Sequence, residues 1–341
     1  MTDAMSSLAT DATTRRQGAR VSVIMPCYNA ADYVGQAVED VLGQTYGPIE
    51  LIVVEDGSTD ASADIVAGYG RDVTLVRQSN AGVSAARNAG LARATGEYVA
   101  FLDADDRWDH RFVETMMAAL DDDKSGSADE RADLAYCGWA RFWGDLDNAR
   151  PFIPGDLESA GRDKLELMLQ CCPFPIHAVL VRLERLRELG GFDRRFPPAE
   201  DYHLWLRLAI RCRFRRVPKV MAYYRRHPAQ QTADHFELTL KRWRMLRKFV
   251  REHRDCLRPL PRGELSDWID GVFRREGYAA YWRRDLPTAR RCFRRMAATG
   301  RIGLADLKVI LPSLVPLSVH EHLLLWRDAS ARDEDVPAVM A

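Results

Sequence analysis

The 341-residue sequence has no net charge, because 49 Lys and Arg residues balance 49 Asp and Glu residues. A dedicated nucleic-acid-binding protein usually carries a clear basic excess, so nucleic acid is not an expected partner. The sequence also lacks a run of about 18 uncharged apolar residues, which argues against a membrane-spanning helix. The nearest candidate, Val309 to Val319, is short and contains Pro312 and Pro316.

Several common site patterns are missing as well. The seven cysteines are odd in number and form no C-x-x-C pair with a matching His or Cys pair, so neither a disulfide framework nor a zinc site is predicted. We expect reduced cysteines and a cytoplasmic location. Neither G-x-G-x-x-G nor the P-loop pattern occurs, which disfavours a nicotinamide cofactor and a Walker-type NTPase. Residues 1–19 lack the apolar core of a signal peptide, and we interpret them as a flexible tail.

The zero balance conceals two regions of opposite charge. Residues 1–120 hold nine Lys and Arg against seventeen Asp and Glu, a net of −8, whereas residues 230–300 hold seventeen against nine, a net of +8. The acidic region is suited to a metal or a cationic partner. The basic region could meet phosphate, anionic lipid or an acidic neighbour.

Short apolar runs alternate with amphipathic segments from Arg20 onward, which predicts an α/β fold with a mostly parallel sheet flanked by helices. The predicted strands are 21–25, 49–54, 73–76, 98–102, 134–142 and 178–182. A first helix is expected after a cap at Asn29, with apolar positions from Val34 to Leu42. Further helices are expected near 59–67, 84–94, 110–121, 162–169, 184–189 and 200–211. From residue 234 the pattern is helical, over 236–254, 265–284 and 287–298. We therefore expect a domain over 20–231, with halves 20–107 and 108–231, and a helical region over 232–341.

Polar clusters follow three of the predicted strands: Pro26 to Asn29, Glu55 to Asp60, and Asp103 to Asp106. In parallel sheets, ligands bind beyond the carboxyl ends of the strands. Asp103, Asp105 and Asp106 would repel one another without a cation, so Mg²⁺ or Mn²⁺ is expected among them. A solvated acidic turn is the alternative, but the position at the sheet edge favours the metal.

Two further residues have one functional and one structural interpretation each. Asp56 could accept from a nucleotide base or a ribose hydroxyl, or it could cap the following helix. Arg87 lies in a helix of very small residues, near its start, where a positive charge opposes the helix dipole. It could contact a pyrophosphate or a base, or it could pair with Asp56 or Asp103.

A third set lies further along the chain. Glu200 and Asp201 open a predicted helix. The helix dipole favours carboxylates in the first turn, so stability alone could explain one of them. A catalytic base has the same requirement, an ionised carboxylate fixed on a rigid element. His227 could bind a metal or phosphate, although a lone His beside Pro is more often a loop residue.

Six ordered segments resemble family 2 glycosyltransferases and span about Arg20 to Gln231. They are Val21 to Asn29, Val54 to Asp60, Gly82 to Gly90, Gly96 to Asp106, Gly190 to Asp193, and Glu200 to Leu208. The resemblance implies a GT-A fold and inverting transfer from a nucleoside diphosphate sugar, most often UDP-linked, with Mg²⁺ or Mn²⁺ as cofactor.

The resemblance also implies roles for individual residues. Asp201 would be the general base, and Glu200 would orient the acceptor. Asp105 would hold the metal, and His227 lies in a segment that closes over the diphosphate and is assigned to the same ion. The nucleotide sugar would contact Asp56 through its base and Asp103 through its ribose. Its remaining contacts would be Pro26, Tyr28, Asn29, Glu55, Arg87 and Ala104.

Two departures from the family pattern narrow the expected function. Glu55 stands where an Asp is usual, and its longer side chain could alter the contacts to the base. The Q-x-x-R-W pattern of processive synthases is missing, because Thr239 precedes Arg242 and Trp243 where Gln is expected. We therefore expect transfer of a single sugar to a hydroxyl of a glycan or glycolipid acceptor, in surface glycan or glycolipid synthesis.

Two other functions compete with this one. A catalytically idle nucleotide-sugar-binding or scaffold protein would need damage among the acidic residues, and none is visible. A nucleotidyltransferase would need a Gly-rich loop with Arg and Lys near the first strand, where this chain has Pro26 to Asn29.

The basic helices and the stretch Ile302 to Trp326, with Leu323 to Trp326 at its end, have two interpretations. They could form a packed helical cap, which we favour, or make peripheral contact with the inner face of an anionic membrane.

Overall fold

The computed structural model describes residues 16–121, 131–158, 163–227, 234–257, 260, 262–300, 302–320 and 322. Contacts divide the chain into unit 1, Met1–Pro228, and unit 2, Ala229–Ala341. The boundary expected after Gln231 lies close to this division. Residues 1–15 of the expected tail and the stretch Leu323 to Trp326 lie outside the described residues.

Four parallel strands form the first half of the sheet in unit 1, in the order β3-β2-β1-β4. They are β1 (Arg16–Cys27), β2 (Tyr46–Glu55), β3 (Val73–Arg77) and β4 (Tyr98–Phe101). The central residues Val23 and Ile24 are fully buried, as expected for apolar strands covered on both faces. β1 starts at Arg16, so the tail predicted for residues 1–19 is wrong for its last four residues.

The second half of the sheet is mixed in direction. β8 pairs antiparallel with β4 and with β6. β9 pairs parallel with β6. β5 pairs antiparallel with β9, and β7 pairs antiparallel with β6. These strands are β5 (Arg107–Trp108), β6 (Leu134–Trp143), β7 (Asp145–Phe152), β8 (Val179–Arg182) and β9 (Phe214–Arg225). The sequence predicted β6 and β8 but missed β5, β7 and β9.

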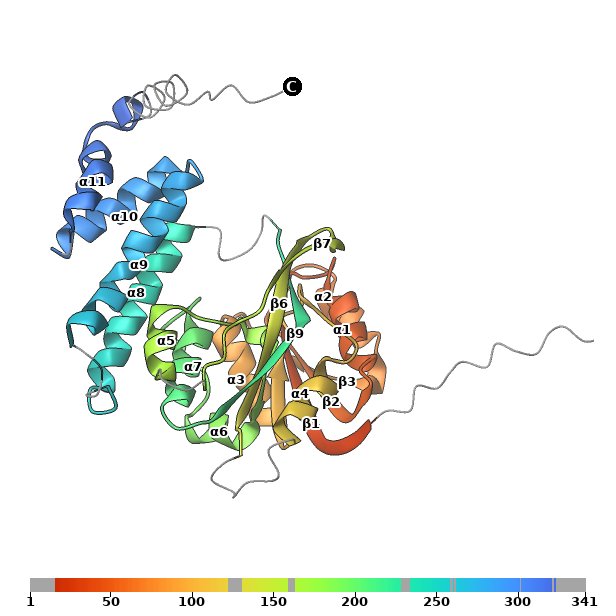
Figure 1. The fold of residues 1–341 in the computed structure, drawn as a ribbon. Coiled ribbons are helices and arrows are strands. Elements are labelled where there is room, and N and C mark those ends of the chain that lie inside the picture. The colour runs from red at the N-terminus through yellow and green to blue at the C-terminus, as the bar shows by residue number, and fades with distance from the viewer. Residues whose placement is uncertain are drawn as a thin grey trace, which may run out of the picture. The chain divides into compact units, whose positions relative to one another are not determined.

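Helices connect the strands of unit 1 and cover the sheet (Figure 1). They are α1 (Val34–Leu42), α2 (Ser62–Ala67), α3 (Val83–Arg93), α4 (Phe112–Asp121), α5 (Lys164–Gln170), α6 (Leu183–Glu188) and α7 (Glu200–Ala209). α3 approaches the sheet very closely, because a Cβ atom placed on Gly90 would lie 2.4 Å from Ile24 Cγ2 of β1. The small residues of this helix thus bring Arg87 against the sheet.

Unit 2 is helical. Its main helices are α8 (His235–Glu252), α9 (Arg262–Trp282), α10 (Leu286–Ala298) and α11 (Leu307–Leu314). Asp234 and Asp285 cap α8 and α10 by accepting from the amides of Glu237 and Thr288. The core includes the fully buried rings of Phe249, Phe273 and Phe293.

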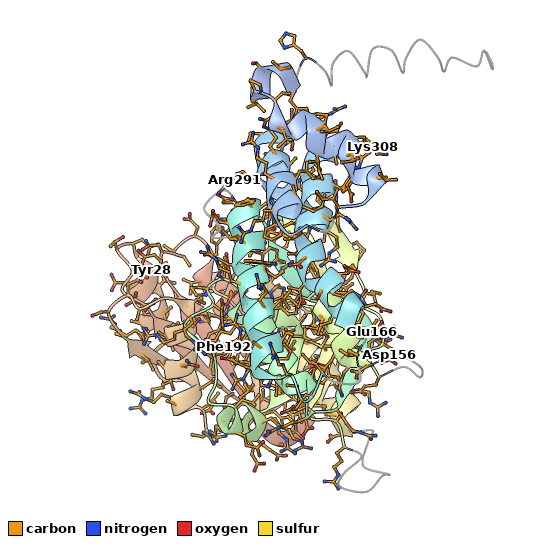
Figure 2. The ribbon with its side chains drawn as sticks, turned by 90° about the vertical axis from the view of Figure 1, so that its left-hand side faces the viewer. Tyr28, Asp156, Glu166, Phe192, Arg291 and Lys308 are labelled. Atoms are coloured by element: carbon orange, nitrogen blue, oxygen red, sulfur yellow. The ribbon has the colours of Figure 1, made fainter. Side chains whose placement is uncertain are left out.

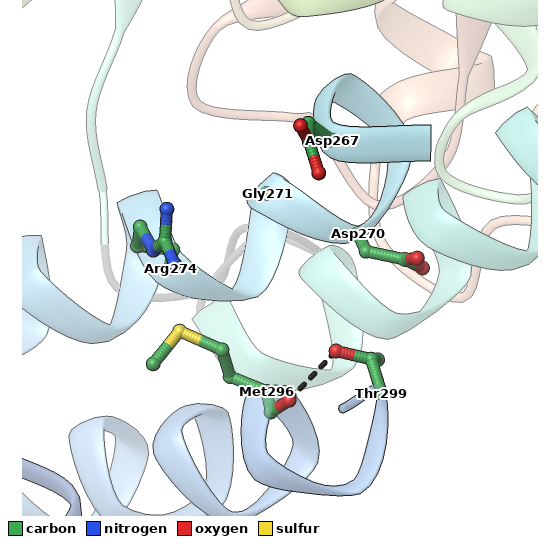
Figure 3. Close-up of a pocket in the computed structure, with 6 residues that line it drawn as sticks. All are labelled: Asp267, Asp270, Gly271, Arg274, Met296 and Thr299. Carbon is green, nitrogen blue, oxygen red and sulfur yellow. Dashed lines mark hydrogen bonds between the residues drawn. The ribbon is translucent and has the colours of Figure 1, made fainter. Parts of the chain in front are cut away.

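A small pocket of about 30 Å³ lies between α9 and α10 (Figure 3). It is lined by Asp267, Asp270, Gly271, Arg274, Met296 and Thr299. This volume is that of one or two water molecules rather than of a substrate. Among the described residues, no helix combines the length and the apolar character needed to cross a membrane.

The contact of α3 with β1 gives a test of the fold. Gly90→Ala should lower the free energy of unfolding by about 1 to 3 kcal/mol, because the new methyl group overpacks the contact with Ile24. Chemical denaturation measures this change. Gly35→Ala in α1 is the matched control, because its Cβ would lie 3.6 Å from the nearest atom, Tyr69 Oη. Equal unfolding midpoints for the two variants would contradict the close packing.

Candidate functional site

The loops that follow β1 and β2 are tied together by Asn29. Its backbone is in the left-handed region, with φ of 48°, which asparagine tolerates better than most residues. Asn29 Oδ1 accepts a hydrogen bond from the Thr59 amide at 2.8 Å, and the Asn29 amide donates to Ser58 Oγ at 3.1 Å. The two predicted polar clusters therefore meet at the carboxyl edge of the sheet.

Asp56 is buried and organises the segment that leads into α3. Its Oδ1 accepts from Gln78 Nε2 at 2.7 Å and from the Ala81 amide at 2.9 Å, and its Oδ2 accepts from the Gly82 amide at 2.9 Å. Each carboxylate oxygen has more than one lone pair, so further acceptance from a ligand is compatible with these bonds. Glu55 accepts from the amide of Ser58, which closes its own turn.

The other residues expected around the nucleotide differ in exposure. Pro26 at the end of β1 and Ala104 after β4 are buried. Tyr28 is 49% exposed and stands at the surface of unit 1 (Figure 2). An exposed ring beside a polar sheet edge is available to stack on a flat ligand.

Arg87 is buried between two carboxylates. Its Nη1 donates to Glu200 Oε1 at 2.6 Å, and its Nη2 donates to Asp103 Oδ1 at 2.7 Å. Burial alone would lower the pKa of Arg87, but Asp103 and Glu200 outweigh it and hold that pKa above its usual range. The ion pair with Asp103 that the sequence suggested for Arg87 is present in the structure. The pairing with Glu200 was not foreseen.

Glu200 and Asp201 open α7, as predicted, and their environments differ. Glu200 is 4% exposed, and burial raises its pKa, with Arg87 opposing the rise. Asp201 is only partly buried, and its Oδ1 accepts from the amide of Tyr202 at 2.6 Å. The pair thus consists of one carboxylate committed to Arg87 and one with access to solvent.

Asp105 and His227 come together although 122 residues separate them. His227 Nε2 lies 2.9 Å from Asp105 Oδ2, and both side chains are partly exposed. This distance is that of a direct hydrogen bond between the two side chains. A carboxylate oxygen and an imidazole nitrogen are also ligands that a divalent ion accepts, and the pair would have to exchange the shared proton for the ion. Within the described residues no group of three or more such side chains could hold a metal, so other ligands would have to come from substrate or water.

Asp106 does not belong to this pair. It is 1% exposed, its Oδ1 accepts from the Arg225 amide at 2.9 Å, and its Oδ2 lies 2.7 Å from Nδ1 of the buried His177. The expectation that Asp103, Asp105 and Asp106 share one cation is therefore wrong for Asp106. Its role is to hold the end of β9 against the acidic turn.

Arg225 at the end of β9 fixes the other side of this turn. Its Nε donates to the Asp105 carbonyl at 2.8 Å, and its guanidinium lies over the rings of Tyr33 and Phe142, at 4.9 and 4.7 Å. The ring of Tyr33 also lies 5.2 Å from that of His227. Sequence reasoning missed Arg225, since β9 itself was not predicted. The only signal was the Tyr-Tyr-Arg-Arg-His segment that ends at His227.

Residues 22–176 match the model of the family described as glycosyl transferase family 2. The chain is 39% identical over 134 residues to the uncharacterised glycosyltransferase YibD of Escherichia coli. This alignment covers 38% of this chain and 39% of YibD. The chain is 28% identical over 269 residues to the uncharacterised glycosyltransferase RT0329 of Rickettsia typhi, in an alignment that covers 76% of this chain and 81% of RT0329. The putative teichuronic acid biosynthesis glycosyltransferase TuaG of Bacillus subtilis is 47% identical over 92 residues, which cover 26% of this chain and 36% of TuaG.

Two solved structures share the fold at low sequence identity. Residues 1–349 of S. aureus TarS in complex with UDP-GlcNAc give a TM-score of 0.56 at 17% identity, covering 88% of this chain and 82% of that one. The mannosyltransferase PcManGT of Pyrobaculum calidifontis, in complex with GDP-Man and Mn²⁺, gives a TM-score of 0.52 at 20% identity. This alignment covers 95% of this chain and 89% of PcManGT. The GT-A fold expected from the sequence is confirmed. The resemblance to family 2 glycosyltransferases expected from the sequence is confirmed over residues 22–176, which match the model of that family.

Proposed function

We propose that the protein transfers a single sugar, with inversion, from a nucleoside diphosphate sugar to a hydroxyl of a glycan or glycolipid in surface glycan synthesis. One observation carries the proposal: Arg87 joins Asp103, two residues before Asp105, to Glu200, the neighbour of Asp201. The proposed donor contacts and the proposed base therefore belong to one connected set of side chains.

UDP is the proposed nucleotide, and TarS in complex with UDP-GlcNAc supports it. PcManGT binds GDP-Man, so the fold accommodates more than one base. We infer that Tyr28, Pro26 and Asp56 receive the base. The ribose would lie against Asp103 and Ala104, with Asn29 and Glu55 holding the surrounding turns. The name of TuaG supports surface glycan synthesis as the context.

Asp105 and His227 would hold Mg²⁺ or Mn²⁺, and Mn²⁺ in PcManGT supports this assignment. A divalent ion there would neutralise charge on the departing nucleoside diphosphate. Asp201 would remove the proton of the acceptor hydroxyl, which then attacks the anomeric carbon on the face opposite the diphosphate. The configuration at that carbon is inverted. Glu200, held by Arg87, keeps the start of α7 in place and so orients Asp201 toward the acceptor.

A catalytically idle sugar-nucleotide-binding protein is the competing function. The intact carboxylates at 103, 105, 200 and 201 argue against it. Incubation with UDP-sugars and Mn²⁺ separates the two functions, because only the enzyme releases UDP.

The base assignment predicts a loss of turnover without a loss of donor binding. Asp201→Asn should reduce Mn²⁺-dependent UDP release from UDP-GlcNAc by about 10²-fold or more, because the amide cannot accept the proton. UDP affinity, measured by calorimetry, should be unchanged. Glu184→Gln is the matched control, since Glu184 is also an acidic residue in the first turn of a helix. UDP release by Asp201→Asn at the wild-type rate would disprove the assignment.

The metal assignment predicts a different pattern. His227→Ala and Asp105→Ala should each weaken UDP binding in Mn²⁺ by at least about tenfold. Replacing a residue that merely hydrogen-bonds to a metal ligand already costs about this much metal affinity. EDTA should weaken binding to the wild type and leave the variants little changed. His110→Ala is the control, because the His110 side chain is 67% exposed and pairs with Asp109, outside the proposed metal site. If His227→Ala binds UDP like the wild type in Mn²⁺, His227 is not a ligand.

For location we propose a cytoplasmic protein with peripheral membrane contact through unit 2. In support, Lys308 of α11 stands at the surface of unit 2 (Figure 2). Four leucines in α11 and the turn before it are also exposed, at helical spacing. They are Leu304, Leu307, Leu311 and Leu314. The packed cap has support of its own, because Arg290 and Arg294 donate to the carbonyls of Pro312 and Ser313 at the end of α11.

Flotation with vesicles of equal parts phosphatidylglycerol and phosphatidylcholine decides between the two. At low salt the protein should float, high salt should reduce the floating fraction, and the triple change Leu304→Ser, Leu311→Ser and Leu314→Ser should abolish it. Trp282→Ser is the control for an exposed apolar residue outside α11. Absence of flotation at both salt concentrations would leave α11 as part of a packed cap.

A further inference from the structure

Three arginines meet where the β6–β7 hairpin borders the end of β9. Arg141 of β6 is the direct cross-strand partner of Arg150 of β7. Arg141 also pairs with Tyr224 of β9, so Arg226, two residues further along the chain, lies near it. Partial burial and then the charge of Arg226 lower the pKa of Arg141. Like charges placed directly opposite each other weaken a sheet. This arrangement is therefore unfavourable for the protein by itself.

Among the described residues, no carboxylate compensates the three charges. In the stretches of chain that the structure describes, none of the three guanidinium groups forms an ion pair or a hydrogen bond. Asp145 and Asp147 lie in the same hairpin and pair with none of them. Elsewhere in unit 1, arginines such as Arg87, Arg107 and Arg185 have carboxylate partners. The β6–β7 cluster is thus a positive surface that an external anion would stabilise.

Aromatic rings alternate with these arginines. The Arg141 guanidinium lies 5.1 Å from the centre of the Trp139 ring, and that of Arg150 lies 5.7 Å from the Trp143 ring. The Trp139 and Phe152 rings are 5.5 Å apart, and Trp143 and Phe152 are each about half exposed. Exposed rings present flat apolar faces, and an arginine stacked on a ring keeps its donors directed outward.

The cluster adjoins the proposed donor site. Arg226 immediately precedes His227, whose Nε2 lies 2.9 Å from Asp105 Oδ2. The Arg226 amide donates to the Phe142 carbonyl at 2.9 Å, so the end of β9 is fixed against the hairpin. A chain bound along the hairpin would therefore lead directly to the place where the sugar is transferred.

We propose that Trp139, Arg141, Trp143, Arg150, Phe152 and Arg226 bind an anionic glycan, a sugar chain carrying carboxylate or phosphate groups. This inference rests on the proposed function and names the class of acceptor. The rings stack on the sugar faces, and the arginines bind the oxyanions. A neutral glycan would satisfy the rings and leave the three charges uncompensated.

Calorimetry with three probes tests the proposal. Oligogalacturonate supplies sugar and charge, tripolyphosphate supplies charge alone, and maltohexaose supplies sugar alone. The wild type should bind oligogalacturonate most tightly, tripolyphosphate more weakly, and maltohexaose least. Arg141→Gln with Arg150→Gln should weaken oligogalacturonate binding by at least about tenfold, the loss expected when charge-assisted hydrogen bonds are removed. Trp143→Ala should weaken oligogalacturonate binding and spare tripolyphosphate.

The control is Arg71→Gln with Arg93→Gln, which removes the same charge from two exposed arginines outside the cluster. UDP binding in Mn²⁺ is measured on every variant. If UDP binds and oligogalacturonate binds no better than maltohexaose, the acceptor proposal is wrong while the donor site stands. If UDP does not bind the wild type, the proposed function itself fails. Tighter binding of a ten-residue oligothymidylate than of oligogalacturonate would assign the cluster to nucleic acid instead.

Discussion

The buried guanidinium of Arg87 lies between carboxylates that come from the two halves of unit 1. Asp103 follows β4 in the parallel half, and Glu200 starts α7 after the mixed half. Removing a charge from water is costly, and only close, well-oriented partners offset that cost. Gly90 is part of the same constraint, because it lets α3 approach β1 closely. Loss of Arg87 would leave Glu200 buried without its cation.

The acidic turn after β4 depends on the second half of the sheet in a similar way. Asp105 points to His227, its carbonyl accepts from Arg225, and Asp106 lies against His177. Each of these partners comes from a segment at least 70 residues further along the chain. The parallel half thus provides the carboxylates, and the mixed half determines how they are oriented. This division explains why neither half alone makes the site.

Much of this arrangement is predictable from sequence, and the limits have physical reasons. Strands such as β1 and β4 are uniformly apolar because they are covered on both faces, and the polar residues that follow them mark the sheet edge. β9 carries no such run: Arg215, Arg216, Pro218 and Lys219 interrupt it, and their exposure hides the strand. β7 is exposed along nearly all its length, so it gives no apolar pattern either. The assignment of Asp105 and His227 to one ion came from family resemblance, because local patterns contain no information on which distant residues lie together.

The central proposal is that Asp105 and His227 hold the ion that accompanies the donor diphosphate. Anomalous diffraction from crystals grown with UDP and Mn²⁺ tests it directly. We expect a manganese peak within bonding distance of Asp105 Oδ2 and His227 Nε2, in contact with the diphosphate of UDP. UDP bound at the edge of the sheet with no manganese at this pair, or manganese at other side chains, would contradict it.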